Sequence, residues 1–182
     1  MRHIPTAIVA LAFSAAAATG AKDWTEPVEV LHDGKRCLSY RARLAGEFLV
    51  IEAAMEPTWH TFAMDNKRRQ DEKLAGKPSL GIERSTEIRV NGGLEAISPW
   101  FQSLPKDLSK PEIRWFTWGF EQQGLFVTKI KRSGPATAQI GMRGQACSEA
   151  ICKNIDVTIS IAVTPPKTAG TDIDWKALEQ VR

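Results

Sequence analysis

The stretch Gly144-Gln145-Ala146-Cys147-Ser148-Glu149-Ala150-Ile151-Cys152-Lys153 joins two segments that the sequence predicts to be β-strands, 136–146 before it and 155–164 after it. In the second segment apolar and polar residues alternate, as they do in a strand with one buried face. The apolar residues on that face are Ile155, Val157, Ile159, Ile161 and Val163. Because a four-residue connection between two strands is typical of a tight turn, the sequence predicts an antiparallel hairpin with one cysteine on each side of its turn.

Cys147 and Cys152 are expected to face each other across this hairpin. Opposite Cα atoms in an antiparallel pair lie about 4.5 to 5.5 Å apart, which is within the range that a disulfide requires. A bond that closes so short a loop stabilises the fold by about 2 kcal/mol at most. At a hairpin mouth it is also accessible to the sulfur of another protein, as reversible exchange requires. The spacing alone leaves a redox-active pair and a purely structural disulfide as alternatives.

Residues 1–21 have the pattern of a secretory signal peptide. Arg2 and His3 precede an alanine-rich apolar run, and small residues precede the charged Lys22. The run is shorter than the about 20 apolar residues that a membrane span needs. We expect cleavage after Ala21 and a mature protein that does not span a membrane. Its location would be periplasmic or secreted, where disulfides persist.

The remaining chain is predicted to form one domain, 22–165, followed by a C-terminal tail, 166–182. The net charge of the whole sequence is only +3, and the basic residues are scattered, which argues against a nucleic-acid-binding protein. Three cysteines leave one, Cys37, without an intramolecular partner. Alternation places Cys37 on the more polar face of its strand. It is therefore either a free, partly covered thiol, or it forms an intermolecular disulfide or serves as a third redox thiol.

Short strand-like segments with turn signals every eight to twelve residues predict an all-β protein built as a β-sandwich. No helical pattern separates these segments, which disfavours a parallel α/β fold. Residues 66–79 are polar and charged and are expected to form an exposed loop, with or without a helical turn. In the tail, the apolar residues Trp175, Leu178 and Val181 have the spacing of one face of a short C-terminal helix.

Two stretches of the sequence are similar to a known family. The hairpin stretch quoted above resembles the active-site hairpin of the amino-terminal periplasmic domain of DsbD, the thiol:disulfide interchange protein, a family related to the disulfide bond corrector proteins. Pro57-Thr58-Trp59-His60-Thr61-Phe62 resembles a Gly-Trp-His-x-Tyr stretch of the same family. The resemblance covers roughly residues 29–163. It implies an immunoglobulin-like β-sandwich.

The resemblance also implies a function. Cys147 and Cys152 would pass electrons to or from thioredoxin-like exported proteins or a membrane electron donor, as a thiol:disulfide oxidoreductase without a cofactor. Cys152 would form the bond with the partner, and Cys147 would resolve it. An aromatic cap would shield the pair, for which Trp118 and Phe120 are the candidates, with core packing as the alternative for both. His60 is a further candidate to face the substrate, as a nearby base or cation, or else it is simply hydrogen-bonded.

The sequence departs from the family immediately after the second cysteine, where Lys153-Asn154 replaces a Pro-Pro pair. The positive charges of Lys153 and Arg143 are expected to favour a thiolate at the pair, and Glu149 to oppose it.

The sequence is also compatible with two other classes of protein. One is a secreted binding module whose disulfide is structural. The other is a copper-binding protein that would use the cysteine pair, His60 and methionines such as Met64 or Met142 as soft ligands. No Met- or His-rich cluster supports the copper protein, and no hydrolase or phosphate-binding motif is present. No metal is therefore expected.

Overall fold

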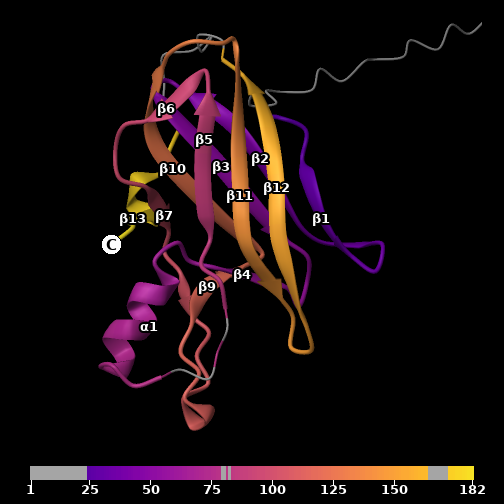
Figure 1. The fold of residues 1–182 in the computed structure, drawn as a ribbon, viewed down its shortest axis with the longest axis vertical. Helices are drawn as coiled ribbons and strands as arrows, with labels where there is room; N and C mark the ends of the chain where they lie inside the picture. Colours follow the sequence, from indigo (N-terminus) through magenta and orange to yellow (C-terminus); the bar gives the residue numbers. More distant parts are fainter. Residues whose placement is uncertain (1–23, 79–80, 82, 164–171) are drawn as a thin grey trace, which may run out of the picture.

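The computed structural model describes residues 24–78, 81, 83–163 and 172–182. Over these residues the protein is a β-sandwich of two antiparallel sheets, with an α-helix at one end (Figure 1). The all-β, immunoglobulin-like class predicted from the sequence is confirmed. The predicted signal peptide lies outside the described residues. So does the first part of the tail.

The larger sheet contains seven strands, in the order β1-β2-β3-β10-β7-β13, with β6 also paired to β10. Their bounds are β1 Val28–His32, β2 Lys35–Ala45, β3 Phe48–Met55, β6 Leu94–Ala96, β7 Phe101–Ser103, β10 Gln123–Arg132 and β13 Leu178–Gln180. β2 and β3 form a hairpin that turns at Gly46, whose φ of 60° is one that glycine adopts without strain. β1 lies at the edge of this sheet, as its proline-flanked sequence predicts.

The smaller sheet contains six strands, in the order β12-β11-β4-β9-β8, with β5 also paired to β11. Their bounds are β4 His60–Phe62, β5 Glu87–Gly92, β8 Lys106–Asp107, β9 Trp118–Glu121, β11 Thr137–Cys147 and β12 Cys152–Ala162. β11 and β12 pair along their whole length. This is the hairpin predicted from the cysteine-containing stretch.

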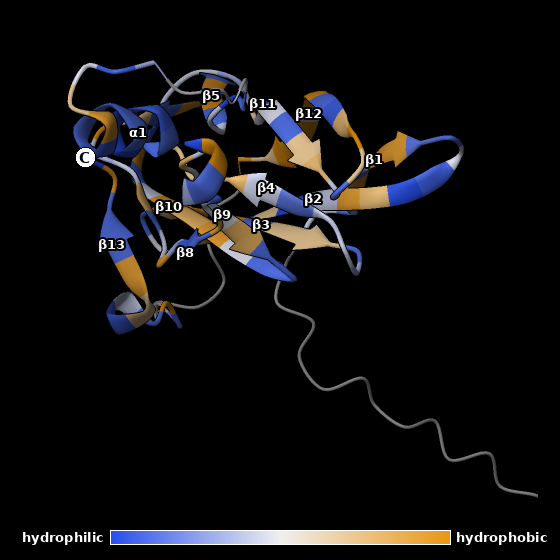
Figure 2. Ribbon diagram, turned by 90° about the horizontal axis from the view of Figure 1, so that it is seen from below, coloured by the Kyte–Doolittle hydropathy of each residue, from blue (hydrophilic) through white to orange (hydrophobic). Residues whose placement is uncertain are grey.

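The core lies between the two sheets and takes apolar side chains from both. Its largest fully buried members include Tyr40, Leu38 and Ile51 from the larger sheet and Ile140, Met142 and Ile159 from the smaller one. The alternation expected for 155–163 is observed, because Ile155, Ile159 and Ile161 are buried while the residues between them are more exposed. Figure 2 shows apolar colouring along β3, which lies inside the larger sheet.

Residues 66–79, expected as an exposed loop, contain helix α1, Asn66–Leu74. Its buried residues Asn66, Gln70 and Leu74 are four apart, so they lie on one face. The first two of these are polar. Hydrophobic periodicity therefore gives no sign of the helix.

The short C-terminal helix predicted around Trp175 consists of the 3₁₀ helix η2, Trp175–Ala177. The chain then continues as β13, which pairs with β7. The predicted helix is therefore limited to one 3₁₀ turn, because the residues after it form the edge strand of the larger sheet.

Cys37 is 1% exposed and does not lie on a polar face, which corrects the expectation from alternation. The register of β1 against β2 passes from Val30 opposite Leu38 to Leu31 opposite Arg36, so Cys37 is an extra residue at a β-bulge. The bulge turns both Cys37 and Leu38 into the core. The thiol of Cys37 donates a hydrogen bond to the carbonyl oxygen of Val30 at 3.1 Å.

Candidate functional site

Cys147 and Cys152 form the last residue pair of the β11–β12 hairpin and are joined by a disulfide. Their Cα atoms are 4.0 Å apart. The turn between them is closed by a hydrogen bond from Ser148 N to Ile151 O at 2.8 Å. The Ser148 hydroxyl oxygen also accepts hydrogen bonds from the backbone N–H groups of Ala150 and Ile151 at 3.3 Å. The turn therefore has its own polar contacts, independent of the disulfide.

The two sulfur-bearing residues differ sharply in exposure. Cys147 is 1% exposed, whereas Cys152 is exposed and follows Ile151, itself 44% exposed. Cys147 is covered because β11 has β4 on its other side, while β12 is an edge strand. An approaching sulfur atom can therefore reach Cys152 but not Cys147.

A row of directly opposite residues runs from the disulfide across four strands of the smaller sheet. Cys147 pairs with Cys152 on one side and with His60 on the other, and His60 pairs in turn with Glu121. Directly opposite residues of an antiparallel sheet project from the same face. The disulfide, the imidazole and the Glu121 carboxylate therefore share one face, opposite to the one on which Ala146 and Phe120 join the core. Lys106 Nζ donates a hydrogen bond to Glu121 Oε2 at 2.9 Å.

His60 is half-buried, and its ring meets the ring of Phe62 edge-on at 5.4 Å. Its Nε2 atom is buried and has no hydrogen-bond partner among the described residues. Burial lowers the pKa of His60, the negative charge of Glu121 opposes this shift, and the positive charge of Lys110 adds to it. His60 is therefore neutral at neutral pH. The sequence left open that His60 is simply hydrogen-bonded. In the part of the chain that is described, its Nε2 atom has no hydrogen-bond partner.

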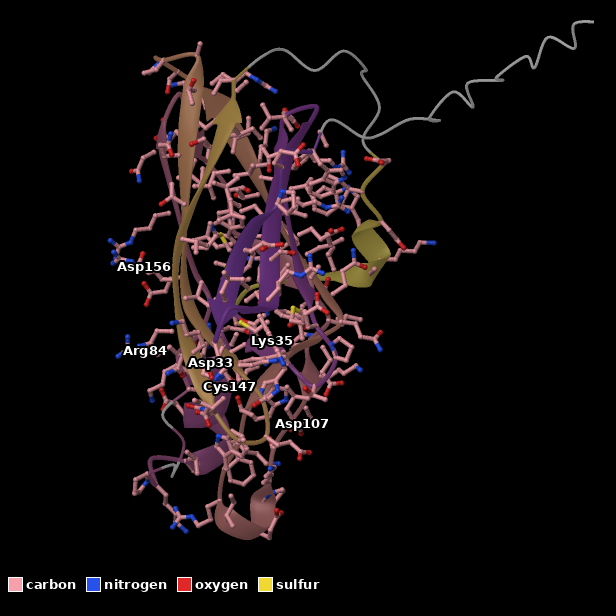
Figure 3. The ribbon with its side chains drawn as sticks, turned by 90° about the vertical axis from the view of Figure 1, so that its right-hand side faces the viewer. Asp33, Lys35, Arg84, Asp107, Cys147 and Asp156 are labelled. Atoms are coloured by element: carbon pink, nitrogen blue, oxygen red, sulfur yellow. A yellow bond between two sulfur atoms is a disulfide. The ribbon has the colours of Figure 1, made fainter. Side chains whose placement is uncertain are left out.

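A cavity of about 570 Å³ lies beside the hairpin turn. It is lined by Thr58, His60, Leu108, Lys110, Trp115, Glu121, Ser148, Glu149 and Ala150. The turn forms one wall, and the excursion between β8 and β9 forms another. In Figure 1 these two segments extend from the same lower end of the sandwich, and Figure 3 labels Cys147 near that end.

The excursion between β8 and β9 is held together by its own contacts. Lys110 and Trp115 exchange two backbone hydrogen bonds, of 2.6 and 3.1 Å, across the 3₁₀ helix η1, Pro111–Ile113. The ammonium group of Lys110 lies 5.2 Å from the centre of the Trp115 ring. These contacts place Trp115 at the cavity. It is the aromatic residue that sequence reasoning missed, although it begins the aromatic run 115–120.

The two aromatic residues expected as a cap lie elsewhere. Phe120 is 2% exposed and meets Phe126 edge-on at 5.5 Å in the core. Trp118 is half-buried and packs against the same core. Neither lines the cavity, so both side chains occupy the positions that the core alternative describes.

The charges near the pair are also arranged differently from the sequence expectation. Lys153 pairs with Ala146, so its side chain starts from the face opposite to the disulfide. Its positive charge lowers the pKa of Cys37, whose net pKa is nevertheless raised by burial. Arg143 forms an ion pair with Asp156 at 3.3 Å. Of the expected charges, only that of Glu149 lines the cavity.

The methionines considered for copper do not join His60. Met142 is fully buried in the core, and Met64 packs against it. Over the described residues, no group of three or more His, Cys, Asp or Glu side chains is placed to hold a metal ion. No helix in the same part of the chain is long and apolar enough to cross a membrane.

No known family model matches the sequence, and no curated protein matches it either. Similar folds exist among solved structures. The N-terminal periplasmic domain of ScsB from Proteus mirabilis matches with a TM-score of 0.54 and 16% identity, over 84% of this chain and 55% of that one. The reduced N-terminal domain of Neisseria meningitidis DsbD matches with a TM-score of 0.48 and 8% identity, over 69% of this chain and 85% of that one. The chain thus spans about half of the ScsB structure and shares the fold of the part that it matches.

Proposed function

We propose that this protein is a thiol:disulfide exchange domain in which Cys147 and Cys152 carry a pair of electrons. The observation that carries the proposal is the unequal exposure of the two bonded residues, buried Cys147 and exposed Cys152, beside a cavity. A disulfide with one accessible and one shielded sulfur can be attacked only at the accessible sulfur, which gives the exchange reaction a defined order. The likeness of the fold to a periplasmic domain of ScsB is consistent with this role.

In the reduced protein the thiolate of Cys152 attacks one sulfur of a partner disulfide. A mixed disulfide forms, and the other partner sulfur leaves as a thiolate. Cys147 then attacks Cys152 Sγ, the Cys147–Cys152 bond forms, and the first partner sulfur leaves. Two electrons pass to the partner, and each departing thiolate takes up a proton. The reverse sequence accepts two electrons from a partner dithiol.

The partners that this chemistry fits are thioredoxin-like exported proteins or a membrane electron donor. Ile151, 44% exposed, follows the cavity-lining Ala150 in the hairpin turn, and Ile113, 48% exposed, lies in the chain between the cavity-lining Lys110 and Trp115. Apolar side chains around an accessible sulfur favour contact with the apolar rim of another protein's cysteine pair. Trp115 lines the cavity beside the hairpin turn, and in this proposal it has the shielding role for which Trp118 or Phe120 was expected.

Export by residues 1–21 belongs to the same proposal, because a disulfide of this kind persists in an oxidising compartment. The precursor is cleaved after Ala21, which leaves Lys22 as the first residue. The mass of the protein recovered from the periplasm or medium of an expressing bacterium tests the cleavage site directly.

The test of function is an exchange assay with a purified thioredoxin as the acceptor. Reduced protein is mixed with oxidised thioredoxin, the reaction is stopped with an alkylating reagent, and the thiols of each protein are counted by mass spectrometry. We expect transfer of two electrons per molecule in the wild type and in a Cys37→Ala control, and none in Cys152→Ala. Equal transfer by Cys152→Ala would contradict the proposal, and a pair that exchanges with nothing would identify the disulfide as structural.

A further inference from the structure

His60, whose buried Nε2 atom has no partner among the described residues, is paired directly with the shielded cysteine. His60 is opposite Cys147 in the β4–β11 pairing, and the two side chains project from the same face. Opposite residues in such a pair have Cβ atoms about 4.5 to 5.5 Å apart, which brings an imidazole within reach of a cysteine sulfur. Buried polar atoms are nearly always hydrogen-bonded, so an unpartnered nitrogen next to a reactive pair requires an explanation, although it is one of eight such atoms among the described residues.

The oxidised state of the Cys147–Cys152 pair explains why Nε2 has no partner. A disulfide sulfur has no hydrogen to donate, so a nitrogen that acts as an acceptor finds no donor across the row. Reduction creates an S–H group on Cys147. Because Cys147 is 1% exposed, water has little access to that hydrogen.

We propose that Nε2 of His60 is the proton acceptor for the Cys147 thiol during exchange. This inference rests on the function proposed above and adds a reacting group to it. When Cys147 resolves a mixed disulfide, its proton moves to Nε2, and the thiolate attacks Cys152 Sγ. The Cys147–Cys152 bond forms, the bond between Cys152 and the partner breaks, and the partner sulfur leaves with the electron pair. In the reverse direction the imidazolium returns the proton to Cys147 as it leaves.

The charged groups around His60 suit this role. Glu121 lies opposite His60 on β9 and stabilises the imidazolium that forms, although Lys106 also bonds to it. Lys110 approaches from the excursion between β8 and β9 and favours the neutral ring, while Glu149 contributes a negative charge from the hairpin turn. Burial favours the neutral ring as well, so a lone pair is available below neutral pH. A neutral imidazole is the form that accepts a proton.

The test follows the resolving step alone, with 5,5′-dithiobis(2-nitrobenzoate) as the probe. Reduced protein reacts at Cys152 and releases one thionitrobenzoate, and attack by Cys147 then releases a second. The rate of this second release does not depend on the probe concentration. It is measured by stopped flow between pH 5.5 and 9.5 for the wild type, for His60→Gln, and for His32→Gln, in which the same change is made in β1, a strand of the other sheet.

In the wild type and His32→Gln, we expect a rate that changes little above pH 7, because the pKa of His60 is lowered from its ordinary value by burial. In His60→Gln the rate should be at least about tenfold lower at pH 6, since a positioned base contributes 10²- to 10⁴-fold. The difference from the wild type should narrow as the pH rises to 9.5, because a growing fraction of the Cys147 thiol then ionises without a base. A purely structural role would lower the rate equally at every pH, and that result would overturn the inference. Failure of the wild type to release the second thionitrobenzoate at all would instead contradict the proposed function.

Should His60→Gln not fold, nitrogen NMR of the wild-type imidazole in both redox states gives the same answer. We expect Nε2 without a hydrogen in the oxidised protein, and a change in its signal on reduction as the S–H group donates to it. A hydrogen on Nε2 in the reduced protein, or a signal that does not change, would overturn the inference.

Discussion

Cys147 and Cys152 are bonded partners at the end of one hairpin, yet Cys147 is 1% exposed and Cys152 lies exposed on an edge strand. The difference arises from strand order, because β11 is paired with β4 on the side away from β12, whereas β12 is the edge strand of the described sheet. The bond therefore has one end that another protein can reach. The predictions below follow from this relationship and from the contacts around it.

The two cysteines should respond differently to substitution. In Cys147→Ala the exposed Cys152 thiol still attacks a partner disulfide, but no second thiol resolves the product, so a stable mixed disulfide should accumulate. Cys152→Ala should form none and lose exchange entirely. Non-reducing electrophoresis and mass spectrometry of each variant mixed with oxidised thioredoxin provide the measurement. Adducts of equal yield through Cys147 would mean that its burial does not restrict access.

Reduction of the disulfide should leave the sandwich folded. A bond that closes so short a loop adds about 2 kcal/mol to the free energy of unfolding, and the β11–β12 pairing already restrains the same ends. Urea unfolding of the oxidised and the reduced protein measures the difference. A loss much larger than about 2 kcal/mol, or unfolding on reduction, would indicate a structural bond.

Trp115 should slow access of small thiols to the disulfide. Its ring lines the cavity beside the hairpin turn, so Trp115→Ala should raise the rate of reduction by dithiothreitol several-fold without changing the fold. Phe116→Ala is the matched control, because the Phe116 ring is not among those that line the cavity and contacts Lys73 instead. An equal increase in both variants would show that loosening of the excursion, rather than the Trp115 ring, controls access.

A buried ion pair should make stability depend on acid pH. Asp65 is 4% exposed and accepts hydrogen bonds from Arg69 Nε at 2.9 Å and from Gln102 Nε2 at 2.8 Å. Burial alone would raise the pKa of Asp65, but these bonds outweigh it and hold the pKa below the usual value. Because the folded pKa is the lower one, the contribution is complete above the unfolded pKa of about 3.9 and is lost as the pH falls through the folded value.

Asp65→Ala should therefore cost about 3 kcal/mol of the free energy of unfolding at pH 7, as expected when one member of a buried pair is removed. The difference from the wild type should shrink below about pH 4. Glu72→Ala removes an exposed partner of Arg68 and should cost less than about 1 kcal/mol. Denaturant unfolding at several pH values measures both, and a difference that does not depend on pH would exclude the ionised carboxylate as its source.

Much of the fold was predictable from the sequence, because it depends on alternation and turn residues. The hairpin containing Cys147 and Cys152 and the alternation along 155–163 are local patterns that the tertiary structure does not override. Helix α1 was not predictable in this way. Its buried face contains Asn66, whose carbonyl oxygen accepts hydrogen bonds from Trp118 N at 2.7 Å and from the Thr117 hydroxyl at 3.2 Å. Only the tertiary structure supplies those donors.

The candidate site was predictable in its cysteines but not in its surroundings. Strict alternation placed Cys37 on a polar face, and a bulge that depends on the twist of β1 against β2 reversed that placement. The run 115–120 contains four aromatic residues, and no signal in the sequence distinguishes which of them reaches the site. Contacts between Lys110 and Trp115 across η1 decide which ring reaches the cavity. The strand order that places His60 between Cys147 and Glu121 is likewise long-range information.

The reduction potential of the Cys147–Cys152 pair tests the central claim most directly. Purified mature protein is equilibrated with glutathione or dithiothreitol buffers of known ratio, thiols are alkylated in acid-quenched samples, and the modified cysteines are counted by mass spectrometry. The account predicts a potential above about −270 mV, within the range of proteins that exchange disulfides. A value well below about −300 mV would contradict it and would identify a structural disulfide in a binding module.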